Sequence, residues 1–238
     1  MKKTFQRAKS IYQISFKKND YLWAKYVSRP PAALLLAMLE DVPVTPHQLT
    51  LFGLLVSFIS CLLFAFRPDK TGLIVGWLCL QLAFIIDCMD GMLARYKNKG
   101  SPEGQKFDFL ADELKTYMTF AAVVWRLYAA SGQTLTLALG MVGVAFMAAG
   151  FATTHFMRSP EYTGLTHHGQ RAFRTGIVGR LEHAASALMH YPSWIWIPVF
   201  LDRMDLFFWI NALIYTAYFL YAFCRVAFKL GRRSRFNA

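Results

Sequence analysis

The feature that most limits how this chain can fold is a series of apolar stretches, each long enough for a membrane-spanning helix. A helix needs about 20 mostly apolar residues to cross a hydrocarbon layer of about 30 Å. Six such segments can be drawn, at 48–66, 73–95, 108–130, 133–157, 180–201 and 206–229. The segment 180–201 is the least apolar of them, because it contains Glu182, His183, His190 and Pro192. The sequence therefore predicts an all-α integral membrane protein with six transmembrane helices.

The distribution of basic residues supports this number of spans. If the N-terminus lies inside, the inner segments contain twenty Lys and Arg residues and the outer loops contain three. Such an excess is typical of cytoplasmic segments, and an odd number of spans would place the basic tail outside. The sequence thus predicts that both termini are cytoplasmic. Topology then accounts for most of the net charge of +12, and no nucleic-acid partner is expected.

The chain divides into three parts. Residues 1–47 are expected to form a cytoplasmic N-terminal segment without a cleaved signal peptide, residues 48–230 a six-span domain, and residues 231–238 a basic cytoplasmic tail. An amphipathic surface helix is expected over about 20–40. Its aromatic residues would lie in the membrane interface and its basic residues near anionic lipid headgroups. Thr45-Pro46 is typical of a helix start and marks the beginning of the first span.

Four carboxylates lie at the inner ends of the second and third spans. Asp87 and Asp90 are three residues apart near the end of one, and Asp108 and Asp112 are four residues apart at the start of the other. Each pair shares a helix face, and a short loop makes the two helices antiparallel neighbours. Unpaired aspartates are costly at such a depth, so a cation is expected between them. Ligands that are all oxygen favour Mg²⁺ or Mn²⁺ over zinc.

Small and basic residues frame the carboxylates. Gly91 and Ala94 lie on the same helix face as the first pair and leave an open notch for a flat base and a diphosphate. Arg95 can pair with phosphate oxygens. Gly104 is expected to let the loop turn tightly into the third span.

The stretch from Asp87 to Asp112 reads D-x-x-D-G-x-x-A-R, then eight residues, then G-x-x-x-D-x-x-x-D. This pattern resembles the signature of the CDP-alcohol phosphotransferase family at all eight fixed positions and in both spacers. The resemblance implies an enzyme of phospholipid biosynthesis that is active at the cytoplasmic membrane face. It would transfer a substituted phosphate group from a CDP-alcohol to an acceptor hydroxyl and release CMP. It also implies that the protein forms a homodimer and contacts membrane lipids.

The resemblance further assigns roles to the matching positions. Asp87, Asp90 and Asp108 would bind divalent metal together with the CDP diphosphate. Asp112 would act as the general base and is also a candidate ligand of a second metal. The remaining residues of the donor site would be Gly91, Ala94, Arg95 and Gly104.

The sequence also predicts an acceptor pocket. Arg180 and His183 are expected to point back into the bundle and contact the acceptor, and Lys115 is close enough to the aspartates to pair with one of them. The donor is CDP-diacylglycerol with a small polar alcohol as acceptor, or CDP-choline or CDP-ethanolamine with a diacylglycerol-like lipid. The short chain favours the first. An ion-coupled transporter is the rival from another class, since intramembrane carboxylates also mark ion pathways. A noncatalytic scaffold would have no use for four clustered anions.

Overall fold

The computed structural model describes residues 2–16, 20–39, 42–159, 162 and 187–234. Within these ranges the chain forms helices and no strand, which confirms the predicted all-α class. The helices with individual bounds are α1 (Lys2–Ile14), the π-helix η1 (Ala24–Ser28), α2 (Arg29–Met38), α3 (Pro46–Phe66), α4 (Lys70–Tyr96), α5 (Pro102–Ser131), α6 (Thr134–Arg158), the 3₁₀-helix η2 (Tyr191–Ser193), α9 (Trp196–Leu201) and α10 (Met204–Ser234).

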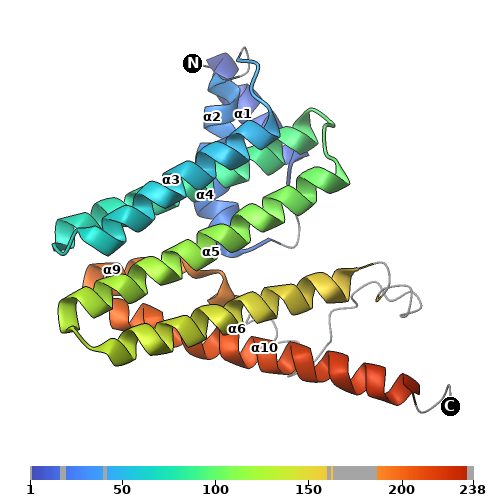
Figure 1. The fold of residues 1–238 in the computed structure, drawn as a ribbon. Helices are drawn as coiled ribbons and strands as arrows, with labels where there is room; N and C mark the ends of the chain where they lie inside the picture. Colours follow the sequence, from blue (N-terminus) through green and yellow to red (C-terminus); the bar gives the residue numbers. More distant parts are fainter. Residues whose placement is uncertain (1, 17–19, 40–41, 160–161, 163–186, 235–238) are drawn as a thin grey trace.

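Long helices make up most of the molecule (Figure 1). In the described part of the chain, α3, α4, α6 and α10 are long and apolar enough to cross a membrane. Helix α5 has 30 residues but carries more charged side chains. It packs against α3, α6 and α10. Five of the predicted spans therefore lie within single long helices, and four of those helices meet the length and composition expected of a membrane span.

The predicted span 180–201 is not one continuous helix in its described part. The backbone leaves the α-helical conformation at His190, forms the short helix η2, and becomes α-helical again only in the six residues of α9. Pro192 contributes to this break because it has no N–H to donate and disfavours an α conformation at the residue before it. The number of six spans is therefore not confirmed.

The N-terminal region contains more helix than the sequence predicted. Helix α1 was not expected. The helix expected over about 20–40 is present as an unbroken helical run over 22–38, in which the π-helical η1 leads directly into α2. Two prolines, Pro30 and Pro31, stand in the first turn of α2, directly after the π-helical segment, and neither has an N–H to donate. Helix α2 buries an alanine-rich face and packs against α1 and α4. Its location at a membrane interface stays a prediction.

Side-chain caps fix where α3, α4 and α5 begin. Thr45 and Gln48 form a reciprocal capping box at the start of α3, with Oγ1 of Thr45 accepting from the Gln48 N–H at 3.3 Å. This confirms the predicted start at Thr45-Pro46. Asp69 caps α4 by accepting from the N–H of Gly72 at 3.1 Å. Ser101 caps α5 by accepting from the N–H of Gly104 at 3.0 Å.

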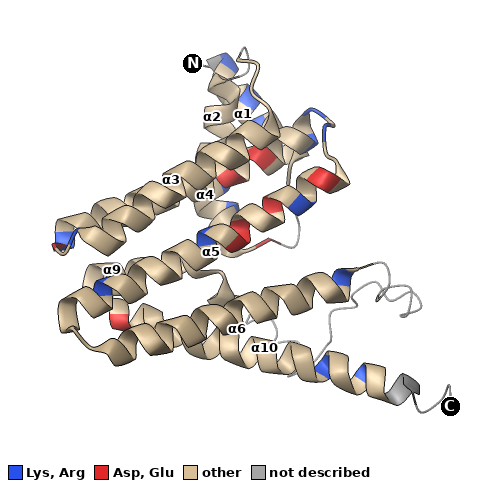
Figure 2. Cartoon of the chain, viewed as in Figure 1, with Lys and Arg blue, Asp and Glu red and all other residues tan. Residues whose placement is uncertain are grey.

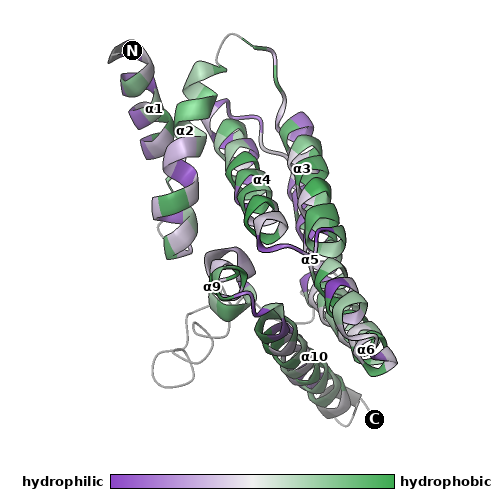
Figure 3. Cartoon of the chain, turned by 90° about the vertical axis from the view of Figure 1, so that its left-hand side faces the viewer, coloured by the Kyte–Doolittle hydropathy of each residue, from purple (hydrophilic) through white to green (hydrophobic). Residues whose placement is uncertain are grey.

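Two buried apolar clusters hold the helices together. One joins α3, α4, α5, α6, α9 and α10, and the other joins α1 and α2 to α3 and the second half of α4. Many large apolar side chains of the long helices remain exposed, as is expected where helices face lipid. Figure 3 shows hydrophobic colouring along α3 and α4, whereas α1 carries more hydrophilic positions.

Glycines of α6 let its neighbours approach closely, as the glycine- and alanine-rich composition of 133–157 predicted. A Cβ on Gly140 would lie 2.3 Å from Cγ1 of Val124 on α5, and one on Gly143 would lie 2.9 Å from the ring of Phe120. A Cβ on Gly150 would meet Tyr218 of α10 at 3.2 Å. Helix α6 is therefore fitted to α5 on one side and to α10 on the other.

Gly140→Ala tests this packing, with Gly231→Ala as its matched control. The first substitution should lower the free energy of unfolding in detergent by about 1–3 kcal/mol, because the added methyl group overpacks the contact with Val124. The control also adds a methyl group to a long helix, but within the described part of the chain that methyl group would meet no atom outside its own helix backbone within 4 Å. Thermal unfolding followed by circular dichroism measures both. Equal stability of the two variants would contradict the close approach of α5 and α6.

Candidate active site

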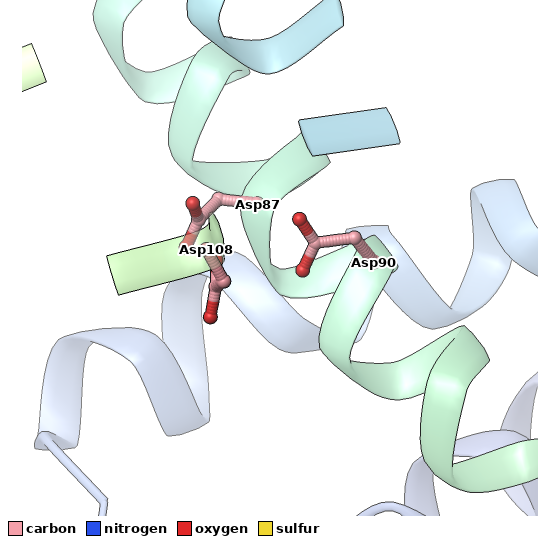
Figure 4. A group of neighbouring side chains, drawn as sticks. All are labelled: Asp87, Asp90 and Asp108. Atoms are coloured by element: carbon pink, nitrogen blue, oxygen red, sulfur yellow. The ribbon is translucent and has the colours of Figure 1, made fainter. Parts of the chain in front are cut away.

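Three carboxylates converge between α4 and α5. Asp87 and Asp90 come from α4 and Asp108 from α5, and one oxygen of each lies within 4.8 Å of the others (Figure 4). Figure 2 shows acidic positions of α4 and α5 near the ends that the loop 97–101 joins. The two helices are not in close backbone contact, whereas α3 packs against both. The carboxylates of α4 and α5 therefore approach one another across a space between the two helices.

Helix α3 supplies a hydrogen bond to the most buried of the three carboxylates. Asp90 is 4% exposed, and its Oδ2 accepts from Oγ1 of Thr50 at 2.5 Å. Thr50 is itself buried and stands one turn after the capped start of α3. The capping box thereby fixes the helix that orients Asp90. Thr50 had not been predicted, because a threonine in an apolar span carries no sign of its partner.

A buried lysine links the two helices beside this group. Lys115 of α5 is 1% exposed, and its Nζ contacts Oδ1 of Asp87 on α4. The same Nζ donates to Oδ1 of Asp112 at 3.1 Å, one turn earlier on α5. The structure thus contains the lysine–aspartate pairing predicted from the sequence. The side chain of Asp112 is 49% exposed, so its carboxylate is held by the lysine and also faces the open space.

The four aspartates line an open cavity of about 930 Å³. Its volume is at the upper end of the range of about 300–1,000 Å³ that is typical of small-molecule sites. Eight of its lining residues had been predicted from the sequence as site residues. They are Asp87, Asp90, Gly91, Ala94, Arg95, Gly104, Asp108 and Asp112.

The small residues open the cavity in two different ways. A Cβ on Gly91 would lie 3.4 Å from a guanidinium nitrogen of Arg95, so the glycine lets this side chain fold back along α4. Gly104 was expected in the loop, but it lies in the first turn of α5 because Ser101 and Pro102 start the helix earlier than predicted. A Cβ on Gly104 would be 3.1 Å from Cε1 of His47, and this close approach is a physical reason for a glycine there.

An arginine–aspartate pair forms another part of the cavity wall. Nη2 of Arg29 lies 2.6 Å from Oδ2 of Asp20, and Nη1 donates to the backbone oxygen of Ser15 at 3.1 Å. Arg29 is 5% exposed and was expected instead near lipid headgroups. That expectation is wrong, because the guanidinium turns inward to partners on the N-terminal segment. Sequence spacing gave no signal for this, since the contact depends on how α2 packs against the segment that begins with α1.

The N-terminal segment also meets the turn around His190. Trp23 donates from Nε1 to Oε1 of Gln81 at 3.0 Å, and Nε2 of Gln81 donates to the backbone oxygen of Pro192 at 3.1 Å. The rings of Tyr21 and His190 stack at 4.2 Å, and both residues line the cavity. Gln81 of α4 therefore joins two segments that are far apart in the sequence. Arg180 and His183, predicted for the acceptor pocket, lie outside the described residues.

The carboxylates of Asp87, Asp90 and Asp108, called the triad below, are of a type that fits a hard divalent cation. All three candidate ligands are carboxylates, which suit Mg²⁺ and Mn²⁺. Mg²⁺ is commonly held by one or two carboxylates together with substrate phosphates. The cavity beside the triad leaves room for such a substrate. The three aspartates can thus hold one metal ion at the edge of a ligand site, and Asp112 does not belong to that group.

Comparison with protein families gives one relevant result. A family model described as CDP-alcohol phosphatidyltransferase matches residues 43–223, which is more than half of the 238-residue chain. The matched region includes all three aspartates of the triad. Comparison with curated proteins gives no match.

Thr50→Val tests the support that α3 gives to the triad. Removal of the hydroxyl leaves Asp90 without this hydrogen bond, and the affinity for Mn²⁺ should fall about 10–100-fold, as it does when partners of metal ligands are lost. Electron paramagnetic resonance of free Mn²⁺ measures the affinity without any substrate. Ser57→Ala is the control, because Ser57 is also buried on α3 and its hydroxyl has no hydrogen-bond partner among the described residues. A similar affinity in both variants would show that Thr50 does not support the site.

Proposed function

The chain belongs to the CDP-alcohol phosphatidyltransferase family, and we propose that it transfers a phosphatidyl group from CDP-diacylglycerol to the hydroxyl of a small polar alcohol. The family is one of transferases of substituted phosphate groups, so the protein is an enzyme of phospholipid biosynthesis in a membrane. Family membership also decides against the ion-coupled transporter. The donor, the acceptor, the metal and the role of each residue are our proposal.

One observation carries the assignment of the site. The carboxylates of Asp87, Asp90 and Asp108 lie within 4.8 Å of one another beside a cavity of about 930 Å³. A nucleoside diphosphate bound there would bring its phosphate oxygens to the cation that the three aspartates hold. Ala94 is a small residue of the adjacent cavity wall, and Gly91 makes room for Arg95, which supplies a positive charge to the same wall.

The proposed reaction is a displacement at phosphorus. The acceptor oxygen attacks the phosphorus atom that carries the diacylglycerol, a new phosphorus–oxygen bond forms, and the bond to the bridging oxygen breaks so that CMP leaves. Asp112 takes the proton of the acceptor hydroxyl, which typically accelerates such a step about 10²–10⁴-fold. A bound Mg²⁺ or Mn²⁺ would neutralise charge on the phosphate oxygens. The half-exposed carboxylate of Asp112, held by Lys115, supports its assignment as the base.

The alternative donor is CDP-choline or CDP-ethanolamine with a diacylglycerol-like lipid as acceptor. Both donors share the cytidine diphosphate, so the triad and its cavity suit either one. The choice of CDP-diacylglycerol rests on the rest of the cavity lining. Asp20, Arg29 and His190 line the cavity as well, and polar groups of this kind suit a small hydrophilic acceptor.

We place the site at the cytoplasmic side of the membrane. This proposal is supported by basic residues that lie at the same end of the helix bundle as the aspartates, because such residues are enriched on the cytoplasmic side. They occur in the loop 97–101, at the end of α6 and at the end of α10 (Figure 2). Cytoplasmic termini and a homodimer belong to the same proposal. Arg67 and Arg203 lie at the opposite ends of the helices, each next to an aspartate with which it pairs.

The decisive experiment pairs each CDP donor with candidate acceptors and follows CMP release. The purified enzyme should release CMP from CDP-diacylglycerol with a small polar alcohol, and excess EDTA should abolish the reaction because the triad needs a divalent cation. Mg²⁺ or Mn²⁺ should restore it. Release from CDP-choline with diacylglycerol alone would establish the alternative donor. Full activity in EDTA would refute the role of the metal.

Asp87→Asn and Asp112→Asn separate donor binding from chemistry. The first variant should lose both turnover and tight binding of the CDP donor, because a ligand of the proposed metal is removed. The second should lose turnover by about 10²-fold or more and keep much of its donor affinity, since the three metal ligands remain. Calorimetry of donor binding alongside CMP release distinguishes the two. If Asp112→Asn binds the donor as weakly as Asp87→Asn, Asp112 is a metal ligand and the base lies elsewhere.

A further inference from the structure

Lys115 lies next to the acidic residues, and the proposed reaction uses it only to hold Asp112. It is 1% exposed, which is rare for a lysine unless it is paired. Its Nζ contacts carboxylates from both helices, Asp87 on α4 and Asp112 on α5. A buried ammonium between two carboxylates is a fixed internal cation, whose desolvation cost is offset by both partners at once.

The lysine divides the four aspartates into two groups. Asp87, Asp90 and Asp108 bring ligand atoms within 4.8 Å of one another and can hold a metal ion. Asp112 is not part of that group, and its Oδ1 is 3.1 Å from Nζ of Lys115. Asp87 belongs to both groups, because a carboxylate has two oxygens and can serve a cation on each side. The space between Asp87 and Asp112, where a second cation would have its ligands, is taken by the ammonium.

We propose that Lys115 stands in place of a second divalent ion, so that the active site of this chain binds one metal ion rather than two. The inference rests on the proposed function, which supplies the metal and its role. A second dication between Asp87 and Asp112 would have to displace the ammonium or lie against it, and like charges at such separation repel. Lys115 is thus a positioning residue. It holds Asp112 beside the metal and leaves that carboxylate free of metal, as a base requires.

Counting Mn²⁺ ions on the detergent-solubilised full-length protein tests the proposal without any turnover. Electron paramagnetic resonance of free Mn²⁺, with calorimetry as a second measurement, should give one ion per wild-type chain, with or without CMP. Two ions per wild-type chain would overturn the inference. This measurement depends on no substitution, so a failure of variants to fold leaves it intact.

Substitutions then ask whether the lysine sets this number. Lys115→Met should admit a second Mn²⁺ per chain, because the charge between Asp87 and Asp112 is lost while both carboxylates remain. Lys115→Arg keeps a cation there and should bind one. Lys106→Met is the matched control, since it removes an exposed lysine from the same helix and should also bind one. A folded Lys115→Met protein that binds only one Mn²⁺ with unchanged affinity would overturn the proposal.

These outcomes can be separated from those of the proposed function. An enzyme that releases CMP from a CDP-alcohol and binds two Mn²⁺ ions retains its function and refutes only the role of Lys115. A protein that binds one Mn²⁺ and releases no CMP from any CDP donor refutes the function and leaves the metal count standing.

Discussion

The structure has to hold mutually repelling carboxylates close together inside a bundle of apolar helices. Repulsion between like charges grows as water is excluded, so the acidic ends of α4 and α5 need both cations and a rigid support. Lys115 provides a cation from within the chain, and it does so by contacting Asp87 and Asp112 across the gap between the helices. Because α4 and α5 are separated at this point, the lysine has to bridge them, and the same separation leaves a cavity for a substrate.

Helix α3 provides the support. It packs against both α4 and α5, which are not in close backbone contact with each other, and its Thr50 hydrogen-bonds Asp90. The reciprocal cap of Thr45 and Gln48 fixes where α3 begins and therefore which turn faces the aspartate. Local helix capping and the geometry of the site are thus linked through one helix. In lipid the backbone N–H and C=O groups must form their hydrogen bonds within helices. A membrane-spanning helix such as α3 is therefore a rigid support for the site.

Much of this arrangement could be predicted from the sequence. Four aspartates at helical spacing on two segments joined by a short loop can meet only near that loop, and the structure brings three of them together. Contacts between distant segments could not be predicted. The partners of Thr50 and Arg29 depend on how α3 and the N-terminal segment pack, which no local pattern encodes. Gly104 was misplaced because Ser101 and Pro102 extend α5 beyond its apolar part, and the break at His190 interrupts a segment whose composition alone resembled a span.

The position of Gln81 has a consequence for biosynthesis. Its amide group accepts from Trp23, which lies 58 positions earlier in the chain, and donates to the backbone oxygen of Pro192, which lies 111 positions later. A chain is synthesised from its N-terminus, and contacts between distant residues form only after both have been made. The aspartates can come together once α5 has been inserted, but the wall around Tyr21 and His190 cannot form until Pro192 has been synthesised. A nascent chain that stops after α6 would thus carry the charged residues of the site without its completed enclosure.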